Sequence, residues 1–390
     1  MLFRSESMNF TITGSDPLIF RDGRPFGDPG HVHGGALRWP WPSTLSGLIR
    51  TRIGEQRAKN YFTVPDKQKN IEAVRRIHCT CLPLWRKAFD QAWQPVFPAP
   101  ADAFCFQKKD QHTNDLNIIP YTYQPADETG GTDLNLAHWM LPVREVNTKP
   151  AKNTPDLWFK EAFFHWLEHG KSANRLCRAD TLGLSWPRLE LRIHTAISPD
   201  TGTADHGRLF SSQGIRLESG SMAEEPGYFA IGIQAADLED NDHLEGSCHL
   251  GGERRVAQIC QIQPFLPSCP DWLDNKQYLR LILASPGKFE GWVPDWLMPD
   301  ETGKFKTHPQ SGVEMRLRSA HLERWQALSG WDFDNKCPKA LSKLVPAGSV
   351  YIIELKESNQ SRLLAENLWG KSLNDDPDGF GLTFIGNISL

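Results

Sequence analysis

Two histidines separated by one residue, His31 and His33, have the residue type and spacing of a catalytic or metal-binding pair. On a strand, side chains two positions apart point to the same face. Together with Arg21 and Arg24 they could act as general acid and base on a phosphodiester, with the arginines stabilising the reacting phosphate. They could also be two metal ligands. Because no third ligand and no partner base follows at a recognisable spacing, we assign no catalytic residue, no metal and no cofactor.

A second pair, Cys79 and Cys81, also has a spacing that metal sites use, but no further Cys or His pair follows at zinc-finger distance. The eight cysteines contain no CxxC motif, and a chain of 390 residues does not need disulfides to fold. We therefore expect reduced thiols in the core. The motifs of P-loop nucleotide binding, zinc proteases and serine hydrolases are all missing, which argues against those enzyme classes.

Four arginines in the first sixty residues have the chemistry to hold RNA. Arg21 and Arg24 lie in a loop rich in Gly, Pro and Asp, and Arg50 and Arg57 lie on the helix predicted to follow it. If the loop folds over the helix, the four guanidinium groups could converge on phosphates or flipped bases. The alternative is a set of surface arginines in salt bridges within the chain.

The C-terminal segment DGFGLTFIG contains Gly379, Gly381 and Gly386. Glycine lets backbone N–H groups approach a phosphate with no Cβ in the way, and it also permits a tight turn into a strand. Both interpretations remain open. Asp378 stands where the RNA-recognition signature of RRM domains has Lys or Arg.

The elements that must position these residues are visible in the N-terminal part. Residues 9–20 predict a strand followed by a turn, and residues 21–35 an ordered loop. A helix follows, capped by Ser43 or Thr44, with an apolar stripe formed by Leu45, Leu48, Ile49 and Ile53. Residues 60–150 predict a sheet region rich in insertions.

Two elements stand out in the middle of the chain. Residues 156–170 predict an aromatic core helix that ends at Gly170. Residues 188–197 alternate between apolar and polar side chains, and together with residues 208–217 they predict a hairpin with a long loop. We expect its apolar residues to face inward and its polar residues to form a partly basic outer face: Leu189, Leu191 and Ile193 inward, and Arg188, Glu190, Arg192 and His194 outward.

Prolines 264, 267 and 270 mark a linker, which we place at residues 265–277. It would separate an N-terminal domain, residues 1–264, from a C-terminal domain, residues 278–390. Both parts alternate strands and helices, so the predicted fold class is α+β.

The charge balance limits how the chain can bind nucleic acid. The formal net charge is −4, with a pI near 6.4. Such a chain has no global basic field, so RNA contacts must come from local arginine clusters. The N-terminal segment lacks the apolar run of a signal peptide, and no apolar stretch is long enough to span a bilayer, so we expect a cytoplasmic protein with no membrane contact.

Several segments spread along the chain resemble one family, the third subunit of the Cmr (type III-B) CRISPR effector complex, within the RAMP superfamily. These segments are DPLIFRDGRPFG (16–27), PWPSTLSGLIRTRIG (40–54), LGGERR (250–255), ASPGKFEGWVPDW (284–296), PAGSVY (346–351) and GFGLTFIG (379–386). The resemblance implies two ferredoxin-like (RRM-like) domains with insertions and a C-terminal glycine-rich loop.

The resemblance also implies a role in antiviral defence: a non-catalytic subunit at the base of the complex that binds the 5′ tag of the CRISPR RNA (crRNA). Its partners would be the large polymerase-like subunit and the adjacent backbone subunit, with target RNA reached indirectly. The positions that would contact RNA are Arg21, Arg24, Arg50, Arg57, Arg254, Arg255, Gly379, Gly381 and Gly386.

Two alternatives share this fold. A RAMP-type metal-independent endoribonuclease would process precursor crRNA with His31 or His33 as the general acid or base. A purely structural adaptor would have no RNA contact at all.

Overall fold

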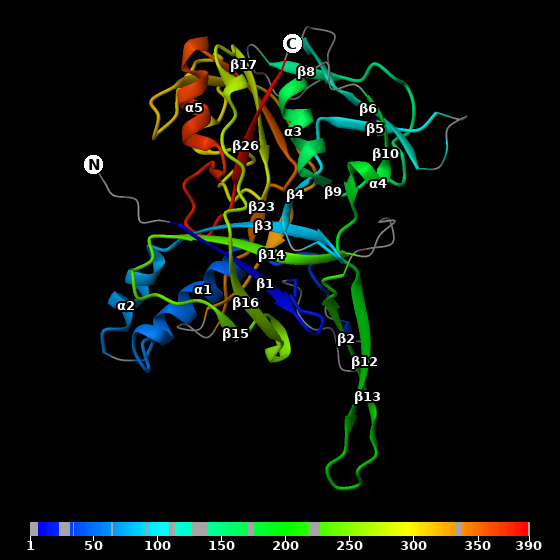
Figure 1. Ribbon diagram of the computed structural model, residues 1–390, viewed down its shortest axis with the longest axis vertical. Helices are drawn as coiled ribbons and strands as arrows, with labels where there is room; N and C mark the ends of the chain where they lie inside the picture. The colour runs from blue at the N-terminus through cyan, green and yellow to red at the C-terminus, as the bar shows by residue number, and fades with distance from the viewer. Residues whose placement is uncertain are drawn as a thin grey trace.

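The computed structural model has a mixed α/β fold dominated by sheets (Figure 1). It describes residues 7–22, 32–33, 35–63, 65–90, 92–108, 112, 114–126, 139–170, 175–218, 227–332 and 337–388, with the backbone alone for 32–33, 205–208 and 331–332. Within these ranges, no helix is both long and apolar enough to cross a membrane.

The N-terminal half is built on an 8-stranded antiparallel sheet with β1 near its centre. Its register places Ile12 opposite Ile231 on one side and Ile259 on the other, which buries three β-branched side chains in neighbouring strands. In sheet order the strands are β11 (Gly183–Leu184), β9 (Leu157–Phe159), β4 (Gln94–Pro98), β3 (His78–Lys87), β14 (Gly227–Ala236), β1 (Met8–Gly14), β16 (Val256–Ile262) and β15 (Gly246–His249).

Helix α1 (Pro42–Arg57) covers this sheet together with α2 (Lys67–Arg75). The predicted stripe is largely confirmed, because Leu45, Ile49 and Ile53 are fully buried. The predicted cap is wrong: the helix begins at Pro42, and Trp41 in the cap position makes no side-chain hydrogen bond. Proline at the first helical position needs no N–H partner and already has a helical φ, so no Ser or Thr cap is required.

The C-terminal half has a 6-stranded antiparallel sheet and one helix, α5 (Ser361–Leu368). Leu364, Ala365 and Leu368 are the buried apolar residues of α5, and they belong to the same core as this sheet. In sheet order the strands are β18 (Lys306–Thr307), β19 (Glu314–His321), β24 (Val350–Leu355), β17 (Tyr278–Leu283), β26 (Leu382–Asn387) and β25 (Lys371–Ser372).

Four neighbouring strands of each large sheet follow the order of a split β-α-β sheet. In the N-terminal half the order is β3-β14-β1-β16, and in the C-terminal half it is β19-β24-β17-β26. A complete ferredoxin-like domain has two helices, one after its first strand and one after its third. In the described residues the N-terminal half has α1 and α2 after its first strand but no α-helix after its third, β14. The C-terminal half has α5 after its third strand, β24, but no α-helix after its first. The prediction of two complete ferredoxin-like domains is therefore not confirmed.

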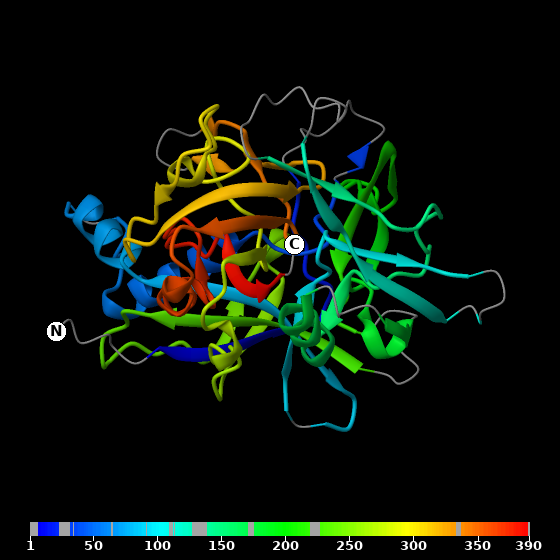
Figure 2. The ribbon, with the colours of Figure 1, turned by 90° about the horizontal axis from the view of Figure 1, so that it is seen from above.

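The insertion in the N-terminal half forms a separate group of short elements on the opposite side of the molecule from α1 and α2 (Figure 2). The predicted aromatic helix, α3 (Lys160–His169), begins four residues late because Leu157–Phe159 pair as strand β9. The other elements of the insertion are β5 (Ala103–Phe106), β6 (Asp115–Pro120), β7 (Thr122–Pro125), β8 (Met140–Val143), β10 (Arg175–Arg178) and α4 (Ala179–Leu182).

The short elements outside the insertion are β20 (Gln326–Leu328), β21 (Trp331–Asp332), β22 (Cys337–Pro338), β23 (Ser342–Leu344) and the 3-10 turns Gly252–Arg254, Asp271–Leu273, Asp295–Leu297 and Ser358–Gln360.

One hydrophobic core contains residues from both sides of the linker predicted at residues 265–277. Phe97 of β4 stacks on Phe163 of α3 with ring centroids 4.3 Å apart, and its edge meets Phe384 of β26 at 5.2 Å. Aromatic rings in this arrangement contribute energy beyond the burial of their area. The two parts of the chain therefore share a core, and the domain boundary at 265–277 stays a prediction.

A long hairpin, β12 (Leu189–Ile197) and β13 (Ala204–Ile215), projects from the body of the molecule (Figure 1). The hairpin is predicted correctly, and at its base Leu189 packs against the core and Arg188 is exposed, as expected. Farther along β12 the predicted orientation is wrong. Leu191 and Ile193 are 53% and 73% exposed, whereas the alternate residues Arg192 and His194 are half-buried. The reason is that the hairpin extends beyond the core, so beyond Leu189 no layer of the described residues packs on this face.

Candidate nucleic-acid interface

Three segments meet where the hairpin joins the body. Leu18 and Ile215 exchange backbone hydrogen bonds of 3.0 and 2.7 Å, which fixes residues 16–20 against the end of β13. The Gly252 N–H donates to the carbonyl of Ile19 at 2.7 Å, which brings the 250–255 loop to the same place. Gly251 has a φ of +80°, and a Cβ there would collide with the Ile19 carbonyl, so this close approach requires glycine.

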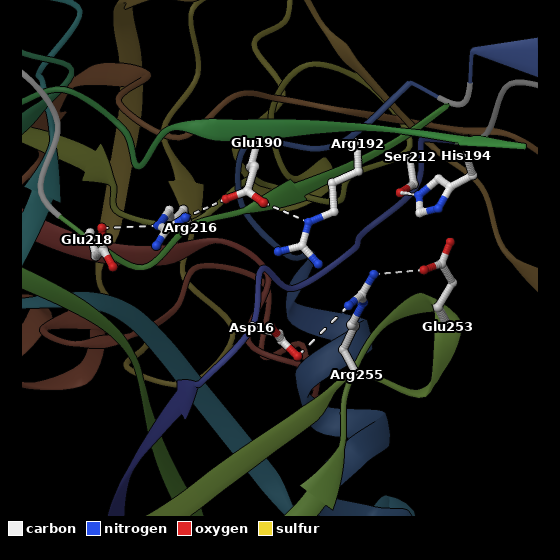
Figure 3. A network of polar contacts seen from close by, with 9 residues as sticks. All are labelled: Asp16, Glu190, Arg192, His194, Ser212, Arg216, Glu218, Glu253 and Arg255. Atoms are coloured by element: carbon white, nitrogen blue, oxygen red, sulfur yellow. Dashed lines mark hydrogen bonds and ion pairs between the residues drawn. The ribbon is translucent and has the colours of Figure 1, made fainter. Parts of the chain in front are cut away.

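The polar face of the hairpin holds a chain of ion pairs (Figure 3). Glu190 accepts hydrogen bonds from Arg192 Nε at 2.7 Å and Arg216 Nη1 at 2.6 Å, and Arg216 Nε donates to Glu218 at 3.1 Å. The bonds from Arg192 and then Arg216 lower the pKa of the Glu190 carboxyl, so it stays ionised. Two of the hairpin arginines are thus neutralised within the chain.

The 250–255 loop adds a second group of polar side chains to this face (Figure 3). Arg255 donates to Glu253 at 2.9 Å and lies 4.0 Å from Asp16. On the hairpin, the His194 ring stacks on Phe210 with centroids 4.9 Å apart, and its Nε2 lies 2.8 Å from Ser212 Oγ. Phe210 keeps its ring partly open to solvent.

Three further arginines around this junction, Arg38, Arg188 and Arg254, are exposed and have no carboxylate partner in the described ranges. Arg254 occupies the positive-φ tip of the loop, at +50°. The segments of Arg38 and Arg188 are held together by the contact of Trp39 with Trp186, whose centroids are 5.6 Å apart. Exposed, uncompensated guanidinium groups around one junction can bind phosphate oxygens bidentately.

The structure brings only some of the predicted RNA contacts to this junction. Arg254 and Arg255 lie in it, and Arg21 is exposed beside it, where its backbone bridges to Ala36. Arg24 and His31 lie outside the described residues, as does the His33 side chain. The sequence pattern did not predict Arg38 and Arg188 as RNA contacts, because each is a single basic residue next to a Trp-Pro pair.

Arg50 and Arg57 are directed elsewhere. Arg57 makes a bidentate pair with Asp242, at 2.9 and 2.6 Å. Arg50 pairs with Asp378 and donates to the carbonyls of Ile77 and Pro377 at 2.9 and 3.0 Å. Both side chains are mostly buried, so the predicted convergence of four arginines is not found among the described residues: these two are used in salt bridges within the chain.

The glycine-rich segment is packed inside the protein. Gly379 has a φ of +92° and Gly381 of +71°, and Gly386 in β26 lies under the aliphatic part of Arg280. Ser46 donates to Asp378 at 2.9 Å, so α1 holds the start of the loop. These contacts give the glycines a role in the turn and its packing, and their contact with RNA remains a prediction.

Replacing Gly379 by alanine should lower the free energy of unfolding by about 1–3 kcal/mol. Its φ is unfavourable for any residue with a Cβ, and that Cβ would collide with the carbonyl oxygen of Cys79. Gly312 is a matched control, since its φ is +71° but no atom lies within 4 Å of its Cβ position. Urea unfolding of both variants would separate the effect of φ alone from the collision, and equal losses would contradict the packing described for Gly379.

Cys79 and Cys81 are core residues, as the sequence predicts. Burial raises the pKa of Cys79 to about 12, so it remains a thiol and a poor metal ligand. In the part of the chain that the structure describes, no group of three or more His, Cys, Asp or Glu side chains could hold a metal ion.

Comparison with known proteins gives one family over nearly the whole chain. The family model described as CRISPR-associated protein (Cas_Cmr3) matches residues 10–388. A search of curated proteins finds no match. The cryo-EM structure of the Type III-B Cmr-beta bound to cognate target RNA and AMPPnP contains a similar chain, with 14% identity, a TM-score of 0.45, and coverage of 88% of this chain and 86% of that one.

Two further solved structures contain chains with lower TM-scores. One is Cmr-beta bound to cognate target RNA, with 14% identity, a TM-score of 0.44 and the same coverages of 88% and 86%. The other is the Csm3-Csm4 subcomplex of the type III-A CRISPR-Cas interference complex, with 10% identity, a TM-score of 0.34 and coverages of 90% and 94%. At these TM-scores the family assignment rests on the family model.

Proposed function

The chain belongs to the CRISPR-associated protein family Cas_Cmr3, the family of the third Cmr subunit that its sequence resembles, and from this premise we propose that it holds the 5′ tag of the crRNA in a type III-B effector complex. In this proposal it is a non-catalytic subunit that anchors the large polymerase-like subunit and contacts the adjacent backbone subunit. Cleavage of target RNA belongs to other subunits.

The observation that carries the RNA-binding role is the group of unneutralised arginines at the hairpin junction. Arg38, Arg188 and Arg254 are exposed there without carboxylate partners in the described ranges, although the chain as a whole is acidic. The partly exposed ring of Phe210, stacked on His194, adds an aromatic surface to the same junction. Guanidinium groups for phosphates together with rings for splayed bases are what single-stranded RNA needs.

The opposite face of the hairpin supports membership of a larger assembly. Leu191, Ile193 and Leu209 expose more than half of their surface on one side of β12–β13, where the described residues of this chain leave them uncovered. The register places Thr195, Ser211 and Gln213 on the same side, so three aliphatic side chains lie exposed among polar ones. Neighbouring exposed aliphatic side chains of this kind are typical of interaction sites. We therefore assign the polar face to RNA and the apolar face to a neighbouring subunit.

Replacing Arg188 and Arg254 by alanine should weaken binding of the full chain to a labelled single-stranded RNA by about tenfold for the pair. Both side chains are exposed and have no carboxylate partner among the described residues, so stability should not change. The slope of log K against log salt should become less steep by about 0.7 for each phosphate that the variant no longer binds. Fluorescence anisotropy over a salt series measures both quantities.

Arg362 of α5 is the control for these variants, because it is paired with Asp271 and Glu366 and lies outside the junction. Its replacement by alanine should leave RNA affinity and salt slope unchanged. If the Arg188 and Arg254 variants bind RNA like the unmodified chain, with the same slope, the junction is not the RNA site.

A further inference from the structure

A second aromatic and cationic surface lies at the end of the N-terminal sheet, beyond the hairpin junction. The turn between β3 and β4 carries Phe89, whose side chain is 95% exposed. Arg86 is near the end of β3, Trp93 is just before β4, and Tyr228 is opposite Arg86 in the register of β14. We name Arg86, Phe89, Trp93 and Tyr228 the turn platform.

The guanidinium of Arg86 is held by aromatic rings. Its carbon lies 4.5 Å from the centroid of Trp93 and 5.9 Å from that of Tyr228. Cation–π contacts of this geometry fix the side chain without neutralising its charge. In the described ranges Arg86 has no carboxylate partner; it reaches only the backbone carbonyl of Asp90, at 3.5 Å, and its buried Nε has no acceptor.

The platform is continuous with the hairpin junction. Tyr228 forms a backbone bridge with Glu218, and Glu218 is the last member of the ion-pair chain that includes Arg216 and Glu190. The Phe229 N–H also donates to the Leu217 carbonyl at 3.1 Å, which fixes the platform to the end of β13. A single-stranded RNA bound at the junction therefore has the turn platform as an adjacent surface onto which it can continue.

We propose that the turn platform binds further nucleotides of the single-stranded RNA held at the junction. Arg86 contacts a phosphate, and the exposed rings of Phe89 and Tyr228, the latter 43% exposed, stack on bases. The charge favours RNA over an apolar protein segment, because a protein that covered Arg86 without supplying a carboxylate would bury an unpaired cation. This inference rests on the proposed RNA-binding function and extends it by a second site.

The test combines crosslinking with matched variants. The complex is purified with its RNA and irradiated with ultraviolet light, and the peptides that carry nucleotide adducts are identified; sequencing the bound RNA shows whether guide or target is attached. We expect adducts on residues 86–93 or 227–236 as well as at the junction. In the full chain, the double change Arg86→Gln and Phe89→Ala should weaken binding to labelled single-stranded RNA about tenfold.

Trp325→Ala is the control, because Trp325 is 47% exposed and also has a cation over its ring, with Lys343 Nζ at 5.2 Å, but it lies in the C-terminal half. The Trp325→Ala variant should bind RNA with the affinity of the unmodified chain. Adducts at the junction without any on the platform, with affinity intact in the double variant, would overturn the platform alone. Loss of a neighbouring subunit in that variant with RNA contacts intact would make the platform a protein-docking site. A complex without adducts on any part of this chain would contradict the proposed function itself.

Discussion

Replacing Asp102 by alanine should lower the free energy of unfolding by about 3–5 kcal/mol. Asp102 and Arg280 are almost completely buried and lie in different halves of the chain, with Arg280 Nη1 2.9 Å from Asp102 Oδ2. Trp166 Nε1 also donates to Asp102 at 3.0 Å. Without the carboxylate, the guanidinium of Arg280 would remain buried with no opposite charge, and the indole N–H would lose its acceptor.

The double variant Asp102→Leu with Arg280→Met is the informative comparison. It removes both charges and retains apolar volume, so it should be much less destabilised than Asp102→Ala. Urea unfolding followed by the total tryptophan fluorescence of the chain would report the change. If Asp102→Ala loses less than about 1 kcal/mol, the ion pair does not join the two halves as the geometry indicates.

Breaking the pair between Arg50 and Asp378 should lower stability by about 2–3 kcal/mol and release the glycine-rich loop. Asp378 accepts from both Ser46 and Arg50 of α1, and Arg50 also holds the carbonyls of Ile77 and Pro377. Asp378→Ala removes the acceptor on which this arrangement depends. Hydrogen exchange of residues 374–381 should rise in that variant and in Arg50→Ala.

A double-mutant cycle separates this contact from general destabilisation. Because Arg50 and Asp378 touch, the loss in the double variant should be smaller than the sum of the single losses. Arg57 is the control, since it lies on the same helix but pairs with Asp242, so Arg57→Ala should destabilise the chain without a selective rise in exchange at 374–381. Additive losses for Arg50 and Asp378 would contradict a direct stabilising contact between them.

Local patterns predicted much of the fold. Side-chain periodicity within a few helical turns or strand residues predicts three elements. These are the apolar stripe of α1, the hairpin at residues 189–215 and the aromatic helix near residue 160. The start of α3 was wrong because Leu157–Phe159 pair with β4, a contact between distant residues. The prediction that Leu191 and Ile193 face inward was wrong because alternation cannot say how far along the hairpin a core extends.

The site was harder to predict because residues far apart in the sequence meet there. Arg50 and Asp378 are 328 positions apart, so no local pattern could show that they pair with each other. Arg254 could be singled out because it lies in LGGERR, a segment that resembles the family. Arg38 and Arg188 become candidates only once the contact of Trp39 with Trp186 brings their segments together.

The central claim, that this chain holds the 5′ tag of the crRNA, is tested most directly by purifying the assembled complex, sequencing its bound RNA and mapping ultraviolet crosslinks on the protein. Small RNAs with a common 5′ tag, crosslinked through that tag to the 250–255 loop and the base of the β12–β13 hairpin, are the predicted result. A complex in which the tag crosslinks to other subunits and never to this chain would contradict it.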